Sequence, residues 1–327
     1  MLYPLIFEPI YKEMVWGSES WDISCREQEM GIIKNGIYRG ERFGAVIGRD
    51  PKKYLGRHLA GPAEFPLLIK LIKTFDDLSV QVHPTDAYAR EKENLQNGKT
   101  EMWHILEAPP NGKLIIGLKK GVTKESFRRA LEAGDPLHCL SYLPIKPGDV
   151  IPIPAGLVHA ITAGVVLVEV QQNSNTTYRV FDYNRPRQLH IDKALDVIDF
   201  DDKLKKSTVT GLEVELGENR CIYYIASPYF AVLKYKIKSM LAEQSDANKF
   251  FTYTCVKGSC QLQWGSSTLN IQTGDSFFVP AAMGNFIIHG ECELLKSFVP
   301  DVKGDFIKPL LEAGHSLADI QKKGAFL

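Results

Sequence analysis

Residues 65–104 read FPLLIKLIKTFDDLSVQVHPTDAYAREKENLQNGKTEMWH. In a β-strand, residues i and i+2 point to the same face of the sheet. A strand ending in SVQVH therefore presents Gln81 and His83 on one face and two valines on the other. By the same rule, Lys99 and Glu101 share a face of a later strand. The stretch predicts two strands that carry metal-binding or charged side chains, with a helix between them.

A second histidine, His159, follows the Pro/Gly turn in IPAGLVHA. Two histidines, a glutamate and a glutamine form a mixed nitrogen and oxygen ligand set, which suits a catalytic divalent metal better than a closed structural site. Taken singly, each residue has a structural explanation, because a histidine before proline is often a turn residue and a glutamate on a strand often lies at a solvated edge. Together, Gln81, His83, Glu101 and His159 predict one metal site.

Four motifs containing these residues stand in order along the chain: QVHP (81–84), GKTEMW (98–103), PAGLVHAI (154–161) and VEVQQNSNTTYRVFDYNR (168–185). In order and spacing they resemble the signature segments of type I mannose-6-phosphate isomerases, zinc-dependent enzymes of the cupin superfamily. The resemblance also takes in WGSESWDIS (16–24) and FPLLIKLI (65–72). It covers about residues 1–200 densely and the remainder loosely.

The resemblance implies a metal-dependent aldose–ketose isomerase. Such an enzyme interconverts mannose 6-phosphate and fructose 6-phosphate through an enediol or enediolate. One divalent ion per chain, expected to be zinc, is bound by Gln81, His83, Glu101 and His159. Five of the six other histidines share no strand face with a second ligand-type residue in a family-like motif, and we predict that they are not ligands: His104, His138, His190, His289 and His315.

Four charged residues near these motifs are candidates for catalysis or substrate binding: Lys70, Lys99, Glu169 and Arg179. Lys70 interrupts an apolar strand, so it either extends its ammonium to solvent at a sheet edge or is held inward by an anion, Glu101 or a substrate phosphate. The resemblance favours the inward position. Glu169, flanked by apolar residues, lies at a barrel mouth or is paired, and it matches a family carboxylate close to the metal. Arg179 either pairs with a nearby acid, Asp182 or Glu169, or lies beside the reacting carbons, as the family pattern implies.

The predicted catalytic residues are therefore Arg179, Glu169 and Lys99, with Glu169 the first candidate for moving the proton and Lys99 the second. Lys70, Lys99 and Arg179 are the predicted substrate-binding residues. The chain departs from its relatives at Asn175, where they usually carry aspartate, so we assign no proton transfer to that position.

The pattern of short strands predicts a mainly β protein with two cupin-like jelly-roll barrels. TGDSFFVPA (273–281) mirrors KPGDVIPIPA (146–155), which indicates a weak repeat at domain scale. We expect a metal-binding catalytic domain at 1–206, with a helical insert at about 117–143. A second, metal-free cupin-like domain with a C-terminal tail follows at 207–327. Helices are predicted over 85–98, 121–134 and 191–206.

Composition limits the partners. Lysine plus arginine equals aspartate plus glutamate at 39 each, so no net charge attracts nucleic acid or a membrane surface. The six cysteines contain no CxxC pair, which predicts reduced thiols. Prolines and charges interrupt the apolar N-terminus, so it does not read as a signal peptide. We therefore expect a cytoplasmic protein, a monomer or homodimer, and the resemblance implies that its partner is a small sugar phosphate.

Two other classes of function remain open at this point. Two histidines and one carboxylate on a cupin also suit an iron oxygenase, because that triad leaves positions for dioxygen. Lys70, Lys99 and Arg179 around the site argue against an oxygenase. A sugar-phosphate sensor without catalysis is the second alternative, and it predicts binding without turnover.

Overall fold

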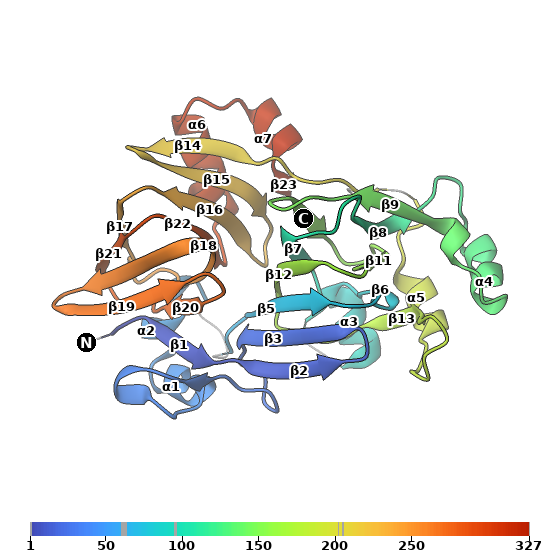
Figure 1. Ribbon diagram of the computed structural model, residues 1–327, viewed down its shortest axis with the longest axis horizontal. Helices are drawn as coiled ribbons and strands as arrows, with labels where there is room; N and C mark the ends of the chain where they lie inside the picture. The colour runs from blue at the N-terminus through green and yellow to red at the C-terminus, as the bar shows by residue number, and fades with distance from the viewer. Residues whose placement is uncertain (1, 60–63, 95–96, 202, 205, 327) are drawn as a thin grey trace. The chain divides into compact units, whose positions relative to one another are not determined.

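A computed structural model describes residues 2–59, 64–94, 97–201, 203–204 and 206–326 (Figure 1). The chain divides into two compact units. The central unit consists of Tyr11–Ser20 and Lys70–Thr208, and the terminal unit consists of Met1–Ile10, Trp21–Ile69 and Val209–Leu327. Both units are discontinuous in sequence, whereas the sequence predicts two continuous domains that meet at 206/207.

Two sheets, of six and five strands, carry the central unit in the part of the chain that is described. The six-stranded sheet runs in the order β10 (Val150–Ile153), β7 (Glu101–Glu107), β12 (Val166–Gln172), β5 (Leu67–Thr74), β3 (Gly17–Ile23) and β2 (Ile10–Met14). The five-stranded sheet runs in the order β13 (Tyr178–Phe181), β6 (Val80–Val82), β11 (His159–Ala160), β8 (Lys113–Leu118) and β9 (Leu140–Pro144).

Strand β7 shows how the sequence positions the site. It pairs with β10 on one side and β12 on the other, so its backbone hydrogen bonds are satisfied inside the sheet. Its first five residues are all buried. Alternation places Glu101 and Trp103 on one face and Met102 and His104 on the other. A carboxylate is thereby carried into the interior at the start of an otherwise apolar strand.

The terminal unit contains a sheet of twelve strands among the described residues (Figure 1). Its main path is β14 (Leu212–Leu216), β15 (Asn219–Ala226), β16 (Ala231–Ile237), β22 (Cys292–Phe298), β18 (Phe251–Trp264), β20 (Ser276–Val279), β1 (Leu5–Glu8) and β4 (Ile32–Ile33). Four more strands pair beside this path: β17 (Met240–Gln244), β19 (Ser267–Gln272), β21 (Asn285–His289) and β23 (Ala325–Phe326).

Pairing and ring packing explain why N-terminal segments belong to the terminal unit. Strand β1 pairs with β20, more than 260 residues later in the chain. The ring of Phe43 lies 5.3 Å from that of Phe65 and 5.0 Å from that of Phe278. Phe65 also packs 5.1 Å from Phe250. These four rings are fully buried and hold segments from both ends of the chain in one core.

The mainly β class is confirmed, but the predicted closed barrels are not what the pairing shows. In the described residues the sheets are open, with β2 and β10 at the two ends of the six-stranded sheet. None of the described helices is both long and apolar enough to cross a membrane. All six cysteines are free and buried, as the sequence predicts.

Seven α-helices are described: α1 (Phe43–Arg49), α2 (Pro51–Tyr54), α3 (Asp86–Glu93), α4 (Lys124–Glu132), α5 (Ile191–Val197), α6 (Lys308–Glu312) and α7 (Leu317–Lys323). The helix predicted over 121–134 is confirmed as α4. The other two are shorter than predicted: α3 ends where Asn94 takes a left-handed conformation at φ 54°, and α5 ends at Val197. Residues 95, 96, 202 and 205 of these predictions lie outside the described residues. The predicted insert at 117–143 contains α4 and then returns to strand β9.

Candidate metal centre

Three side chains that can bind a metal meet inside the central unit. His83, Glu101 and His159 are all buried, and their ligand atoms lie within 4.8 Å of one another. His83 Nε2 is 3.3 Å from Glu101 Oε1, and His159 Nε2 is 3.8 Å from Glu101 Oε2. Glu101 opens β7 of one sheet, while His159 opens β11 and His83 follows β6 in the other. The group therefore lies where the two sheets of this unit face each other.

Backbone carbonyls orient both imidazoles. His83 Nδ1 is 2.9 Å from the Thr176 carbonyl oxygen, and His159 Nδ1 is 2.8 Å from that of Leu157. A carbonyl only accepts hydrogen bonds, so each Nδ1 carries the proton and each neutral ring keeps a lone pair on Nε2. Both Nε2 atoms face Glu101. This is the arrangement in which a protein holds histidines as metal ligands.

The electrostatics keep both histidines neutral and the glutamate ionised. Burial, reinforced by the Lys99 ammonium, lowers the pKa of His83 to about 4. Burial also lowers the pKa of His159, against the opposing effect of Glu101. Burial alone would raise the pKa of Glu101, but the Lys99 ammonium beside it holds this pKa well below its usual range. Two neutral imidazoles and one carboxylate are the protonation states that a metal site requires.

Gln81 and Arg179 extend this group across the five-stranded sheet. Gln81 lies directly opposite His159 in the β6–β11 pair and directly opposite Arg179 in the β6–β13 pair. Residues directly opposite each other in an antiparallel pair share a face. The Gln81 amide nitrogen is 3.4 Å from His159 Nε2. All four predicted ligands are thus brought together, with Arg179 next to Gln81 in the same row.

Lys99 lies within the ligand group itself. Its buried ammonium is 2.5 Å from Glu101 Oε1 and 3.4 Å from His83 Nε2. A protonated lysine has no lone pair, so it cannot act as a ligand. Lys99 instead places a positive charge directly beside the group. Strand β7 begins at Glu101, so Lys99 lies just before the strand and not on a strand face shared with Glu101.

Lys70 is held inward, and its direct ion-pair partners differ from the predicted Glu101. Its ammonium lies 3.0 Å from Glu169 Oε1 and 3.5 Å from Glu19 Oε2. Burial would lower the pKa of Lys70, yet Glu169, Glu19 and Glu101 together raise it. The second oxygen of Glu169 accepts a hydrogen bond of 2.9 Å from Trp103 Nε1. Of the two possibilities left open for Glu169, the structure shows the paired one.

Arg179 is bound mainly by neutral groups. Its Nε donates to Ser79 Oγ at 3.2 Å, and its Nη1 donates to the Gln188 carbonyl at 2.9 Å. Asp182 Oδ2 is farther away, at 3.9 Å. That carboxylate is occupied by Arg187, whose Nε and Nη2 both donate to it at 2.6 Å. Ion pairing with Asp182 is therefore not what fixes Arg179.

The residues present fit a divalent metal ion. Two imidazole lone pairs, a buried carboxylate and a neighbouring amide form the mixed set expected for a catalytic site. Glu101 Oε2 is buried and receives no hydrogen bond from any described residue, so a ligand-free carboxylate is unsatisfied there. No second group of this kind occurs in the described parts of the chain. The carbonyls of Thr176 and Leu157 were not predictable, because no sequence pattern marks a backbone acceptor.

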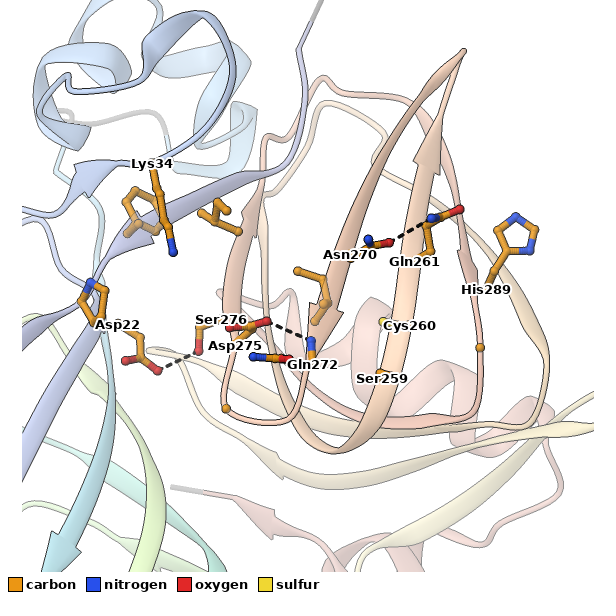
Figure 2. Close-up of a pocket in the computed structure, with 16 residues that line it drawn as sticks. Asp22, Lys34, Ser259, Cys260, Gln261, Asn270, Gln272, Asp275, Ser276 and His289 are labelled. Atoms are coloured by element: carbon orange, nitrogen blue, oxygen red, sulfur yellow. Dashed lines mark hydrogen bonds between the residues drawn. The ribbon is translucent and has the colours of Figure 1, made fainter.

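A separate cavity of about 690 Å³ lies in the terminal unit (Figure 2). Two pairs of its polar side chains bond each other: Ser276 Oγ donates to Asp22 at 3.0 Å, and Gln261 Nε2 donates to Asn270 at 2.9 Å. None of the predicted site residues lines this cavity.

Comparison with known proteins gives consistent matches. Residues 219–299 match the family model described as mannose-6-phosphate isomerase, cupin domain. The chain is 36% identical over 322 residues to the probable mannose-6-phosphate isomerase GmuF of Bacillus subtilis, covering 91% of this chain and 99% of that relative. It is 31% identical over 319 residues to mannose-6-phosphate isomerase ManA of the same organism, covering 90% and 98%. The crystal structure of the mannose 6-phosphate isomerase from Bacillus subtilis superposes with a TM-score of 0.83 at 30% identity, covering 90% of this chain and 99% of that one.

Proposed function

This chain belongs to the family of type I mannose-6-phosphate isomerases in the cupin superfamily, and on that premise we propose that it interconverts mannose 6-phosphate and fructose 6-phosphate. The single observation that supports this most is the buried group of His83, Glu101 and His159, with the Gln81 amide beside it. The relatives named above carry this activity in their names. The predicted family and enzyme class are confirmed; the substrate and mechanism are our proposal.

We propose that His83, Glu101, His159 and Gln81 hold one zinc ion. The histidines bind through Nε2, because each Nδ1 is committed to a carbonyl. In the structure the Gln81 amide nitrogen faces His159. A rotation of the amide by a half-turn would place its oxygen there instead, and the two atoms are similar in size. A bound divalent ion supplies positive charge that polarises the carbonyl and the adjacent hydroxyl of the opened sugar.

The isomerisation removes a proton from C2 of the aldose and returns one to C1, through an enediolate whose two oxygens carry the developing negative charge. Arg179 and Lys99 are positioned to stabilise that charge, because both lie next to the ligand group without binding in it. Lys70 adds a further buried cation near Glu101. Preorganised cations of this kind stabilise charge that is present only in the transition state.

Glu169 is our first candidate for the group that moves the proton, and Lys99 is the second. Glu169 is ranked first because Lys70 and Trp103 orient its two carboxylate oxygens, and a positioned carboxylate can act as a general base. Lys99 is ranked second because its ammonium is held directly against Glu101. We further propose that the terminal unit carries a second, metal-free cupin domain, since the family model matches there.

A coupled assay for fructose 6-phosphate, before and after chelation, tests the proposal. We expect mannose 6-phosphate to be turned over without dioxygen, activity to disappear on chelation, and zinc to restore it. Dependence on dioxygen would identify an oxygenase instead. Binding of mannose 6-phosphate by the metal-replete protein without turnover would identify a sensor. Full activity after complete removal of metal would exclude a catalytic ion.

Single substitutions assign the ligands. His83→Ala and Glu101→Ala are each expected to lower both metal content and activity, because loss of one of four ligands weakens a site strongly. His104→Ala is the matched control, since His104 is equally buried on the same strand as Glu101 but on the other face. It should keep its metal. Full metal occupancy in His83→Ala or Glu101→Ala would remove that residue from the ligand list.

A further inference from the structure

Gln171 is a buried side chain of β12 for which the mechanism above has no use. It lies directly opposite Glu101 in the β7–β12 pair, and its side chain is fully buried. Opposite residues in an antiparallel pair share a face, so Gln171 lies on the face from which Glu101 reaches the two histidines. Glu169 and Trp103, the next opposite pair along these strands, lie on this face as well.

The amide of Gln171 has one satisfied end and one unsatisfied end. Its Nε2 donates to two backbone carbonyls, that of Gln172 at 2.8 Å and that of Ser174 at 2.5 Å. Because carbonyls only accept, these two contacts fix which end of the amide is nitrogen. Its Oε1 is buried and receives no hydrogen bond from any residue that the structure describes. A buried acceptor without a donor is unfavourable, so a donor is expected when the site is filled.

The donors on this side of the site are already engaged. Lys99 pairs with Glu101, and both Lys70 and Trp103 contact Glu169. None of these three donors contacts the buried amide oxygen, so a ligand that enters the site can supply the donor that it lacks. A phosphate dianion offers no donor, whereas each hydroxyl of an opened sugar offers one.

We propose that Gln171 Oε1 accepts a hydrogen bond from a non-reacting hydroxyl of the sugar, on C3, C4 or C5, and so helps determine substrate specificity. This rests on the proposed isomerase function. The proposed contact accounts for the way in which Gln171 is held. Two backbone carbonyls fix the orientation of its amide, on the strand that pairs with the one carrying Glu101. A site built to bond a hydroxyl discriminates strongly against an analogue that lacks it, because its own polar group is then left unpaired.

The test compares mannose 6-phosphate with its 3-deoxy, 4-deoxy and 5-deoxy analogues, using the wild-type enzyme and Gln171→Met. Methionine keeps the length of the side chain but has no amide oxygen. We expect kcat/KM for mannose 6-phosphate to fall by about 10- to 100-fold in Gln171→Met, with metal content unchanged. With one analogue, the two enzymes should perform alike, because the hydroxyl that Gln171 contacts is already missing.

Ser174→Ala is the control for the loop that Gln171 also supports. The Ser174 hydroxyl donates to the Asn97 carbonyl at 3.3 Å and accepts from the Thr176 amide at 3.3 Å, so its loss loosens the same loop but removes no atom of Gln171. Its effect should be equal on all four substrates. An equal loss on all four substrates in Gln171→Met, a loss of metal, or unchanged activity would each overturn the proposal.

If Gln171→Met does not fold, Gln171→Glu takes its place, since it keeps an oxygen at the same distance along the side chain. It should discriminate against the same deoxy analogue as the wild type, and loss of that discrimination would overturn the proposal. Failure of the wild-type enzyme to isomerise mannose 6-phosphate is a different result. It would refute the isomerase function itself, whatever Gln171 contacts.

Discussion

Arg179 differs from the neighbouring Arg187 in the charge of its partners. Arg187 is committed to Asp182 through two short hydrogen bonds, which is a structural ion pair. Arg179 bonds a hydroxyl and a carbonyl, and its ion pair with Asp182 is longer, at 3.9 Å, so its positive charge is compensated less than that of Arg187. Its position opposite Gln81 directs that charge to the side of the sheet that carries the ligand group. Arg179 is thus available to an anion in a way that Arg187 is not.

We predict that Arg179→Ala lowers kcat by about 10²- to 10³-fold while metal content stays unchanged, since that is the usual effect of losing one preorganised stabilising group. Steady-state kinetics and metal analysis of the purified variant give both values. Arg187→Ala is the matched control. We expect it to lower the free energy of unfolding and to change kcat less than Arg179→Ala does. A raised KM with nearly normal kcat in Arg179→Ala would instead mean that Arg179 grips the substrate equally in the ground and transition states.

At the scale of single residues, the sequence predicts which side chains belong to the site better than it predicts the groups that those side chains contact. The period of two along a strand is enough to group Gln81 with His83, and it also groups Lys99 with Glu101, although Lys99 lies just before β7. Lys70 has ion-pair partners on two other strands, and only the fold brings Glu169, 99 residues away, to 3.0 Å. The backbone carbonyls that orient the imidazoles could belong to residues of any type, so the sequence does not indicate them. Sequence therefore identifies candidate ligands and leaves their supporting contacts to the structure.

At the scale of single elements, α4 shows the most complete agreement between local sequence and structure. The Thr123 hydroxyl accepts from the Ser126 amide at 3.2 Å, and the Ser126 hydroxyl accepts from the Thr123 amide at 2.9 Å. These reciprocal bonds form a capping box. Phe127, Ala130 and Leu131 are buried on one side, as their spacing predicts. Such signals lie within one element, which is why they can be read without knowing the fold.

We predict that Thr123→Ala lowers the free energy of unfolding by about 1 kcal/mol, the typical effect of removing an N-cap hydroxyl. Thr123→Ser keeps the hydroxyl and should stay close to the wild type. Urea unfolding followed by circular dichroism measures both variants. Equal stability of Thr123→Ala and the wild type would mean that burial of the apolar face alone holds α4 in place.

At the scale of the whole molecule, prediction succeeds for the mainly β class, while the two compact units include long-range packing that no local pattern marks. The pattern of short strands correctly gives a mainly β protein. It does not reveal that Phe43 and Phe65 pack with Phe250 and Phe278, because nothing local marks which distant rings will share a core. Pairing of β1 with β20 is equally non-local. Continuous domains are the simplest division of a sequence, and long-range packing overrides that division here.

The core of the terminal unit also contains a buried polar network that composition does not suggest. Glu243 accepts from Tyr235 at 3.0 Å, from Tyr253 at 2.8 Å and from the Lys296 ammonium at 2.5 Å. Lys296 also lies 3.9 Å from the centre of the Phe251 ring, a favourable cation–π contact. Burial, together with Glu243, raises the pKa values of Tyr235 and Tyr253 well above their usual range. Both phenols therefore stay neutral in the folded chain at pH values where they ionise once the chain unfolds.

This network predicts a loss of stability in alkali. Below pH 10, which is about the pKa of an unfolded tyrosine, neither state ionises and the contribution of Tyr253 is constant. Above pH 10 the unfolded state releases a proton that the folded state keeps, so the free energy of unfolding falls by about 1.4 kcal/mol per pH unit for each such tyrosine. Tyr253→Phe should therefore lose less stability between pH 10 and 11 than the wild type, by about that amount. Tyr11→Phe, at a residue that is 65% exposed, serves as the control and should follow the wild type. Urea unfolding at pH 9, 10 and 11 measures the three slopes, and equal slopes for Tyr253→Phe and the wild type would show that Tyr253 ionises alike in the folded and unfolded chain.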